Sequence, residues 1–147
     1  MDVRKVRFSD EVVGPLIDGL TAEYDERYGA NEEMSRASAE EFDPPAGAFM
    51  VVVEAGRVVA GGGYRHHTEG VCEVKRMWTD GRYRRRGLAA VVLAALEEDA
   101  ARAGYGKVIL ETGPRQPEAA ALYERTGYAR VAYYGHYEEA LAFEKEL

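Results

Sequence analysis

The sequence predicts a single α/β domain, residues 1–147, built on a mixed and mostly antiparallel sheet of six to seven strands with helices on both faces. The chain has 147 residues, about the usual size of one domain, and 46% of them are hydrophobic. Short apolar segments with the two-residue alternation of strands recur along the chain, and segments with a 3.6-residue apolar stripe separate them. Their order, β-α-(α)-β-β-β-α-β-α-β-β, favours one sheet layer covered by helices on either side.

The first half of the chain is expected to form one strand, one long helix and a meander of three strands. The first strand is expected at Val3 to Phe8, and the helix from Asp10 to Tyr28. Residues 31–45 are acidic and end in two prolines, so they are expected to form short helical turns and loop. Tight turns then join three antiparallel strands, which are expected at Ala48–Glu54, Arg57–His67 and Val71–Thr79.

The second half is expected to add two helices and the strands that complete the sheet. An arginine-rich turn leads into a helix from Leu88 to Ala103, which ends at Gly104, a residue type favoured just past a helix. Proline favours the first helical position, which predicts another helix from Pro117 to Gly127. The three remaining strands are expected at Lys107–Thr112, Tyr128–Tyr134 and Leu141–Glu146.

Charge and cysteine content exclude several classes of partner. The 19 basic and 26 acidic residues give a net charge of -7, which repels nucleic acid. Cys72 is the one cysteine, so an internal disulfide and a thiolate zinc site are excluded. The longest apolar run, Leu88 to Leu96, is about half as long as a membrane-spanning helix, and the N-terminus lacks the apolar core of a signal peptide. We expect a cytoplasmic protein with no metal, no nucleic acid and no membrane partner.

The arginine-rich turn is the strongest candidate binding feature. Arg82, Arg84, Arg85 and Arg86 lie within five positions of an otherwise acidic chain, and Gly87 follows directly before the predicted helix. A helix N-terminus presents unpaired N–H groups and the positive end of the helix dipole, which bind anions, and glycine lets a phosphate approach the backbone closely. The pattern fits a phosphate-binding turn and fits equally a solvated turn that caps a core helix.

The motifs around this turn resemble those of the GNAT N-acetyltransferase superfamily. Arg84-x-x-Gly87-x-Ala89 is similar to the acetyl-CoA pyrophosphate loop of that family, and the preceding segment 73–79 looks like its fourth strand. The segment Ala119-x-x-Leu122-Tyr123-x-x-x-Gly127-Tyr128 resembles the second cofactor motif. These features follow the family's order within residues 71–147, about half of the chain. In one departure, Arg85 stands where the family often has a glycine.

The resemblance implies the acyl-CoA N-acyltransferase fold, in which two neighbouring parallel strands splay apart and the pantetheine arm of acetyl-CoA enters the gap. In this chain the splayed pair would be Val71–Thr79 and Lys107–Thr112. Backbone groups of Met77 and Thr79 would bind the pantetheine amides, and the arginine-rich loop would hold the pyrophosphate. The residues that the resemblance places at the cofactor are Met77, Trp78, Thr79, Arg84, Arg85, Arg86, Gly87, Leu88, Ala89, Thr112, Gln116, Ala119 and Tyr123.

The resemblance also implies two catalytic side chains. Glu73 matches a strand position where some family members carry a glutamate base, which would help to deprotonate the acceptor amine. The alternative role for Glu73 is an ion pair with a neighbouring cation, and Glu111 or a water is then the base. Tyr123 matches the family's frequent general acid, which would protonate the departing CoA thiolate. The alternative role for Tyr123 is packing in the core.

These features together indicate an acetyl-CoA-dependent N-acetyltransferase that acetylates a primary amine of a small molecule by direct attack in a ternary complex. The alternatives are a protein or peptide N-acetyltransferase and a non-catalytic acyl-CoA-binding regulatory module. The acidic residues between Glu32 and Asp43 would attract a cationic amine or form a solvated surface. A pocket or the contact of a homodimer is expected at Tyr133, Tyr134, His136 and Tyr137.

Overall fold

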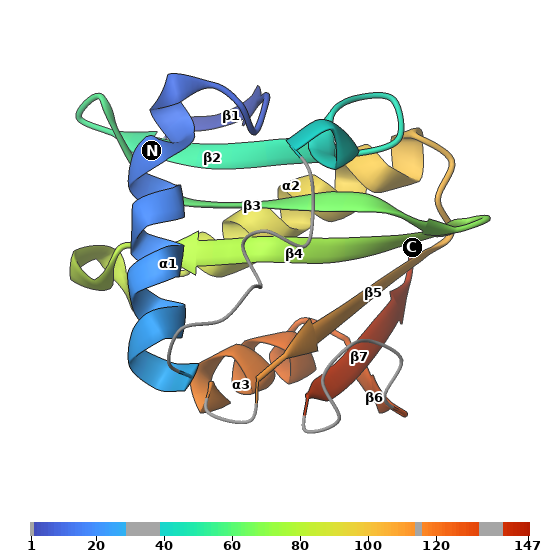
Figure 1. Ribbon diagram of the computed structural model, residues 1–147. Coiled ribbons are helices and arrows are strands. Elements are labelled where there is room, and N and C mark those ends of the chain that lie inside the picture. Colours follow the sequence, from blue (N-terminus) through green and yellow to red (C-terminus); the bar gives the residue numbers. More distant parts are fainter. Residues whose placement is uncertain (1, 29–38, 114–115, 133–139) are drawn as a thin grey trace.

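The computed structural model describes residues 2–28, 39–113, 116–132 and 140–147, and places seven strands in one sheet (Figure 1). The order across the sheet is β1-β2-β3-β4-β5-β7-β6. Every neighbouring pair is antiparallel except β4 and β5, which are parallel, so the predicted mixed and mostly antiparallel sheet is confirmed. The strands are β1 (Asp2–Val6), β2 (Ala48–Glu54), β3 (Arg57–Thr68), β4 (Val71–Thr79), β5 (Lys107–Thr112), β6 (Ala129–Val131) and β7 (Leu141–Glu146).

Three α-helices and three short 3-10 helices occur in the described residues. Helix α1 (Gly14–Tyr28) crosses one face of the sheet, and α2 (Leu88–Arg102) packs on the opposite face (Figure 1). Helix α3 (Pro117–Arg125) connects β5 to β6 and contributes to the same core as α2. The 3-10 helices are η1 (Glu11–Val13), η3 (Ala39–Phe42) and η4 (Gly81–Tyr83).

Two apolar clusters, one on each face of the sheet, hold the helices in place. The α2 cluster joins buried helix residues such as Val92 and Leu96 to strand residues such as Val52 and Phe143. Each such side chain stabilises the fold by about 1.5–3 kcal/mol when it is fully buried. The α1 cluster contains Phe8, Val13, Leu16, Leu20, Phe42, Phe49, Val51, Val53 and Val58. The helical stripe of the N-terminal segment therefore faces the sheet as its spacing predicted.

The first strand ends earlier than the sequence predicted, at Val6 and not at Phe8. The Asp10 carboxylate accepts a hydrogen bond from the Arg7 N–H at 3.1 Å, and this contact turns the chain out of the strand. Phe8 instead packs its ring 5.2 Å from the Phe42 ring, inside the α1 cluster. The alternation of apolar and charged residues therefore extends beyond the strand, because a local turn ends the strand first.

Two other boundaries also differ from the prediction. The α-helix begins at Gly14, because η1 precedes it, so Pro15 is the second residue of the helix, where a missing N–H breaks no helical hydrogen bond. Strand β6 is shorter than predicted and begins after Tyr128, whose buried side chain donates a hydrogen bond to Glu97 at 2.8 Å. The predicted pocket or homodimer contact at residues 133–137 lies outside the described residues.

Consecutive glycines at positions 61 to 63 do not interrupt β3, because each lets a neighbouring element approach more closely than a side chain would permit. A Cβ atom on Gly63 would lie 2.6 Å from the Phe49 ring and 2.7 Å from the Phe42 ring. A Cβ atom on Gly61 would lie 2.5 Å from Leu16 of α1. These glycines therefore set the distance between the sheet and the α1 cluster.

We predict that Gly63→Ala lowers the free energy of unfolding by about 1–3 kcal/mol, because the added methyl group overpacks two buried rings. The matched control is Gly14→Ala, since a Cβ there meets no atom within 4 Å and the residue has helical dihedral angles. This control should leave stability unchanged or raise it by about 0.4–1 kcal/mol. Urea denaturation of both variants measures the difference. Equal stability of the two variants would contradict the packing argument.

Candidate active site

Strands β4 and β5 pair over three positions and then diverge. Parallel pairing joins residues 71–73 of β4 to residues 107–109 of β5. Beyond this point β4 continues to Thr79 and β5 to Thr112 along different directions (Figure 1). Strand β5 pairs instead with β7 along its whole length. The sheet therefore splits between β4 and β5 toward their C-terminal ends, as the resemblance implied.

A β-bulge in β4 lies beside this split. Lys75 is opposite Gly63 of β3, but Trp78 is opposite Gly61, so β4 has one residue more than β3 in this interval. Arg76 carries the irregularity and has a φ of +65°. A bulge bends its strand and increases the local twist. The bulge thus bends β4 in the region where the strand has left β5.

The bulge also changes the face on which the next side chains lie. In a regular strand, residues an odd number apart lie on opposite faces. Val74 belongs to the α2 cluster and Met77, three residues later, packs against that same cluster. Trp78 packs against the α1 cluster on the other face. The inserted residue therefore brings the indole ring of Trp78 under α1.

On the side that faces the split, the backbone of β4 beyond position 73 is a strand edge with no neighbouring strand among the described residues. The N–H of Asp80 donates a hydrogen bond to the Val59 carbonyl of β3 at 2.8 Å. Because backbone groups alternate in direction along a strand, Trp78 and Asp80 are directed toward β3, and Met77 and Thr79 toward the opposite edge. Pairing with β5 on that edge ends at position 73. The N–H and C=O groups of Met77 and Thr79 therefore face the gap.

Asp80 anchors the turn that follows β4. Its carboxylate accepts a hydrogen bond from the Arg82 N–H at 2.9 Å and two from the Arg82 guanidinium at 3.2 and 3.0 Å. These hydrogen bonds lower the pKa of Asp80 to about 2, below the ordinary value of about 4. A lowered pKa stabilises the folded turn at every pH above about 4, and this contribution is lost as the pH falls toward 2. Arg57 adds an ion pair to Asp80 at 3.7 Å.

The N-terminus of α2 is open and lacks a side-chain cap. Gly87 precedes the helix with a φ of +75°, and a Cβ atom there would meet nothing within 4 Å. The first N–H groups of a helix have no partner within the helix, so they form a site for an anion. Arg85 has a φ of +65°, a conformation that glycine adopts without strain. This backbone geometry explains why a glycine suits the position at which the sequence departs from the family pattern.

The arginines of the loop have different partners. Arg82 binds Asp80, as described above. Arg86 forms an ion pair with Glu54 at 3.3 Å, and its guanidinium lies 5.0 Å from the centre of the Tyr83 ring. Arg84 lines a cavity described below, and Arg85 is exposed. Direct contact of Arg84, Arg85 and Arg86 with the cofactor stays a prediction, because two of the loop's four guanidinium groups hold the loop itself together.

Glu73 lies where β4 and β5 begin to diverge, and its carboxylate is bound by Arg65. It is the last residue of β4 that pairs with β5, and only 5% of it is exposed. Its Oε1 accepts a hydrogen bond from Arg65 Nε at 3.0 Å, and Arg65 also binds Glu41 of η3 at 2.9 Å. Its neighbours Cys72 and Val74 belong to the α2 cluster, so Glu73 is on the α1 face. The ion pair foreseen as an alternative is present, and the role of base stays a prediction.

Tyr123 lies on the other face of the sheet, in the α2 cluster. Its ring centre is 5.8 Å from that of Tyr128 and 5.6 Å from that of Phe143, and 5% of the residue is exposed. Burial raises the pKa of its hydroxyl to about 12. The phenol is therefore protonated at neutral pH. The two catalytic candidates thus lie on opposite faces of the sheet.

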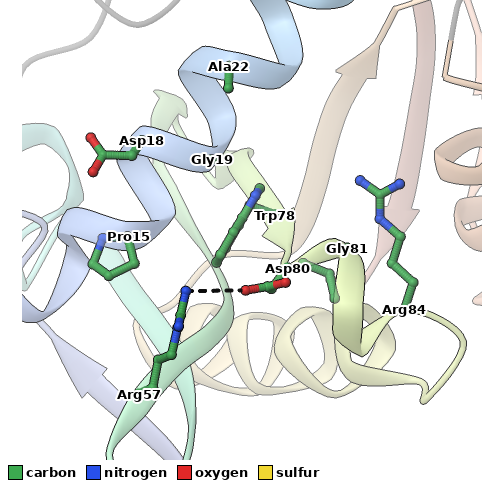
Figure 2. A pocket seen from close by; sticks show the side chains of 10 residues that line it. Pro15, Asp18, Gly19, Ala22, Arg57, Trp78, Asp80, Gly81 and Arg84 are labelled. Atoms are coloured by element: carbon green, nitrogen blue, oxygen red, sulfur yellow. Dashed lines mark ion pairs between the residues drawn. The ribbon is translucent and has the colours of Figure 1, made fainter.

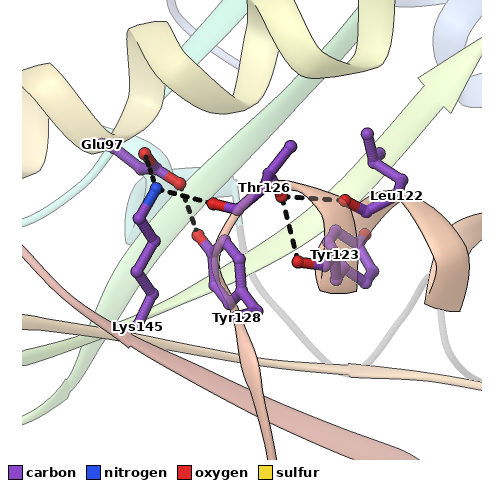
Figure 3. Close-up of polar contacts among 6 residues, drawn as sticks. All are labelled: Glu97, Leu122, Tyr123, Thr126, Tyr128 and Lys145. Atoms are coloured by element: carbon purple, nitrogen blue, oxygen red, sulfur yellow. Dashed lines mark hydrogen bonds and ion pairs between the residues drawn. The ribbon is translucent and has the colours of Figure 1, made fainter.

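A polar network fixes the end of α3 beside Tyr123 (Figure 3). The Thr126 hydroxyl donates a hydrogen bond to the Tyr123 carbonyl at 3.2 Å. Lys145 of β7 donates to the Thr126 carbonyl at 2.8 Å and to Glu97 of α2 at 3.0 Å. The Tyr128 hydroxyl binds the second oxygen of Glu97. The network therefore joins α2, α3 and β7 around the backbone that carries Tyr123.

The remaining candidates lie at the end of β5 and the start of α3. The Gln116 side-chain carbonyl accepts hydrogen bonds from the Thr112 hydroxyl at 3.3 Å and from the Gly113 N–H at 3.1 Å, so it stabilises its own turn. Ala119 packs half-buried against the α2 cluster. Glu111 is half-buried, and the alternation of β5 places it on the same face as Glu73. Cofactor contacts of Thr112, Gln116 and Ala119 stay predictions.

A cavity of about 650 Å³ opens between α1 and the end of β4 (Figure 2). The Trp78 ring packs so closely against Gly19 of α1 that a Cβ atom there would overlap the indole. The lining residues are Pro15, Asp18, Gly19, Ala22, Arg57, Trp78, Thr79, Asp80, Gly81 and Arg84. The cavity adjoins the β4 backbone that faces the gap and the arginine-rich loop. Sequence reasoning missed Gly19, Arg57 and Asp80, because these segments are far apart in the chain.

Comparison with known proteins agrees with this geometry. A family model described as the Acetyltransferase (GNAT) family matches residues 17–128. The chain belongs to the GNAT acetyltransferase family. It is 29% identical over 139 residues to the uncharacterized N-acetyltransferase YjgM of Escherichia coli (strain K12), a match that covers 89% of this chain and 83% of that protein. It is 36% identical over 90 residues to an IAA acetyltransferase of Azospirillum brasilense, covering 60% and 59% of the two chains.

The fold is also that of solved GNAT proteins. The PaiA N-acetyltransferase of Thermoplasma acidophilum, solved in complex with coenzyme A, superposes with a TM-score of 0.75 at 13% identity, and the match covers 100% of both chains. This similarity shows the fold alone. Within the residues described, no three His, Cys, Asp or Glu side chains gather where they could hold a metal ion. In the same residues, no helix is long and apolar enough to span a membrane.

The residues present fit acetyl-CoA, which GNAT acetyltransferases use. The N-terminus of α2 behind Gly87 would hold the pyrophosphate, because no side chain of the N-cap residue binds its first N–H groups and a Cβ at Gly87 would meet open space. The backbone groups of Met77 and Thr79 would bind the pantetheine amides, since they face the gap as a strand edge does.

We predict that Gly87→Val weakens CoA binding several-fold, because the side chain enters the space that the phosphates need beside the N–H groups. Isothermal titration calorimetry with CoA measures the change. The matched control is Gly70→Val, since Gly70 also has a φ of +75° and open space around a Cβ, but lies in the β3–β4 turn. Both variants share the backbone strain, and only Gly87→Val should lose affinity. A similar loss in both would show that strain, and not the site, governs binding.

Proposed function

We propose that this protein is an acetyl-CoA-dependent N-acetyltransferase that acetylates a primary amine of a small molecule by direct attack within a ternary complex. The split between β4 and β5 is the observation that carries the proposal. Glu73 lies on the α1 face, at the last paired position before the split, and Tyr123 lies in the cluster on the α2 face. An acceptor arriving on one face and a leaving group on the other would each have a proton-transfer group at hand.

The reaction forms one bond and breaks one. Bound acetyl-CoA supplies an acetyl thioester, whose C–S bond breaks as the amine nitrogen forms the amide bond. The amine loses one proton and the departing sulfur gains one, so the products are an N-acetyl amine and free CoA thiol. Glu73 would accept the first proton, with Arg65 fixing the position of its carboxylate. Backbone N–H groups at the edge of β4 would stabilise the negative charge on the carbonyl oxygen.

Tyr123 would supply the second proton. Its pKa of about 12 makes it a weaker acid than an exposed phenol. Desolvation also disfavours the charged thiolate of CoA, so an apolar site raises the proton affinity of the acceptor as well as the pKa of the donor.

The cavity supports a small-molecule acceptor. Its volume of about 650 Å³ lies within the usual range of small-molecule sites, about 300–1,000 Å³. A protein or peptide acceptor would need a longer groove. A non-catalytic acyl-CoA-binding module would need neither of the two catalytic side chains.

An acceptor screen with acetyl-CoA tests the proposal. Small primary amines and peptides with free amino groups are compared by the release of CoA thiol. We expect release that depends on a small amine. Release with peptides alone would support the protein acetyltransferase. Binding of CoA by calorimetry without release for any amine would support the regulatory module.

We predict that Glu73→Gln lowers kcat by roughly 10²–10⁴-fold, the usual range for loss of a general base. The affinity for acetyl-CoA should stay close to that of the parent. Steady-state kinetics of thiol release measure kcat, and calorimetry measures the affinity for acetyl-CoA. Full activity of Glu73→Gln, with loss of activity in Glu111→Gln, would instead assign the base to Glu111.

We predict that Tyr123→Phe lowers kcat by roughly 10²-fold, equal to about 2.7 kcal/mol of transition-state stabilisation. The change removes one hydroxyl and keeps the ring, so the aromatic packing survives. The matched control is Tyr128→Phe, another buried phenol, whose hydroxyl binds Glu97. The control should lose stability, because the partly buried Glu97 carboxylate loses a donor, and should keep its kcat. Thiol-release kinetics and thermal melting of both variants separate the two roles, and parent-like kcat in Tyr123→Phe would remove it as the acid.

A further inference from the structure

The cavity between α1 and the end of β4 has a charge pattern that acetyl transfer itself does not require. Its side chains include two guanidinium groups, from Arg57 and Arg84, and two carboxylates, from Asp18 and Asp80. The Trp78 indole forms a flat apolar wall among them (Figure 2). Such a lining combines a surface for a carbon skeleton with donors for a charged group.

Arg57 has the hydrogen-bonding capacity that a ligand needs. Within the described residues, its one ion pair is with Asp80 at 3.7 Å, which is longer than a hydrogen bond. Asp80 already accepts three shorter hydrogen bonds from Arg82. The Arg57 side chain is 53% exposed, and it lines the same cavity as the Trp78 ring. A guanidinium presents donors in a planar fork that matches the two oxygens of a carboxylate.

The cavity lining carries two guanidinium groups and two carboxylates, but immediately around Arg57 two guanidinium groups share one carboxylate, which leaves a local positive excess there. Arg57 and Arg82 share the single carboxylate of Asp80, in a chain whose net charge is -7. Asp18 is exposed, and its carboxylate is directed away from the Trp78 ring (Figure 2). This excess attracts an anionic group and disfavours a protonated amine. Attack on a thioester requires the neutral amine, so the same field favours the reactive form.

We propose that this cavity binds the acceptor and that the acceptor is an amine that also carries a carboxylate, such as an amino acid or a related amino carboxylate. Arg57 holds the carboxylate, and the carbon skeleton lies against Trp78. The amine extends past Thr79, which lines the cavity and belongs to the β4 edge that faces the gap. The inference rests on the proposed function and adds the substrate class to it. Bonds and protons change as in the reaction given above.

Ligand binding can be measured without catalysis, because Trp78 is the one tryptophan of the chain. Its fluorescence therefore reports on this cavity alone. A series of unbranched amino carboxylates of increasing length is titrated into the protein without acetyl-CoA, beside the matching carboxamides. We expect saturable fluorescence changes with the acids, at concentrations roughly 10- to 100-fold lower than with the amides. The chain length of the amino carboxylate that binds most tightly indicates the distance between Arg57 and the gap.

Three variants test the role of Arg57. Arg57→Gln should abolish the preference for acids over amides, both in fluorescence titrations and in KM for thiol release, and should leave CoA affinity unchanged. Arg57→Lys should recover part of the preference, since it keeps the charge and loses the planar fork. Arg102→Gln removes another exposed positive charge, at the far end of α2, and should behave as the parent.

The outcomes separate this inference from the proposed function. Transfer to amines with no preference for a carboxylate would overturn the inference and keep the acetyltransferase. Loss of CoA affinity in Arg57→Gln would also overturn the inference, because the cavity would then belong to the cofactor. Saturable binding of amino carboxylates without thiol release would keep the carboxylate site and overturn the acetyltransferase.

Discussion

The geometry of the site depends on one extra residue in β4. The bulge at Arg76 lies where the strand has left β5, and it reverses the faces of the side chains that follow. Without it, Trp78 would point into the α2 cluster and the cavity under α1 would lose its wall. The direction of the backbone at Met77 and Thr79 depends on the same register against β3. A single irregularity in the sheet thus sets both the strand edge that faces the gap and the indole wall of the cavity under α1.

The turn after β4 contacts both the arginine-rich loop and the cavity under α1. Asp80 is paired to β3 through its backbone, and its side chain organises η4 and contacts Arg57. The loop that leads to Gly87 starts from this anchored turn. The arginine-rich loop and the cavity under α1 therefore share one buried carboxylate, which hydrogen bonds from Arg82 keep ionised above a pKa of about 2. If both regions bind ligands as proposed, preorganisation of this kind would lower the entropy lost on binding.

Exposed charges and buried proton-transfer candidates occupy different regions around the split. A chain of net charge -7 concentrates arginines at the start of α2 and beside the cavity, where anionic groups of both ligands would lie. The two catalytic candidates are less exposed to solvent than these arginines. Glu73 is buried beside Arg65, and Tyr123 is buried among aromatic rings. Under the proposed function, long-range attraction and proton transfer would use different parts of the site, since the first needs exposed charge and the second needs low solvent access.

The sequence by itself determined the elements, the mixed sheet and the open start of α2. Each of these depends on residues close together in the chain: alternation marks strands, a 3.6-residue stripe marks helices, and glycine and proline mark helix ends. Strand ends were less certain, because the turn at Asp10 overrides an alternation that continues to Phe8. The motifs around Gly87 were also visible, since the family's cofactor loop is a continuous segment.

Only the tertiary structure decided how distant segments meet. The ion pair of Glu73 with Arg65 depends on the register of β3 against β4. The cavity depends on the contact of Trp78 with Gly19, which a regular strand would have prevented. An inserted residue reverses the face of every side chain that follows it in the strand. No local pattern in the sequence of β4 marks the position of the insertion. The packing of α1 against the sheet selects that register, because it determines which side chains can be buried together.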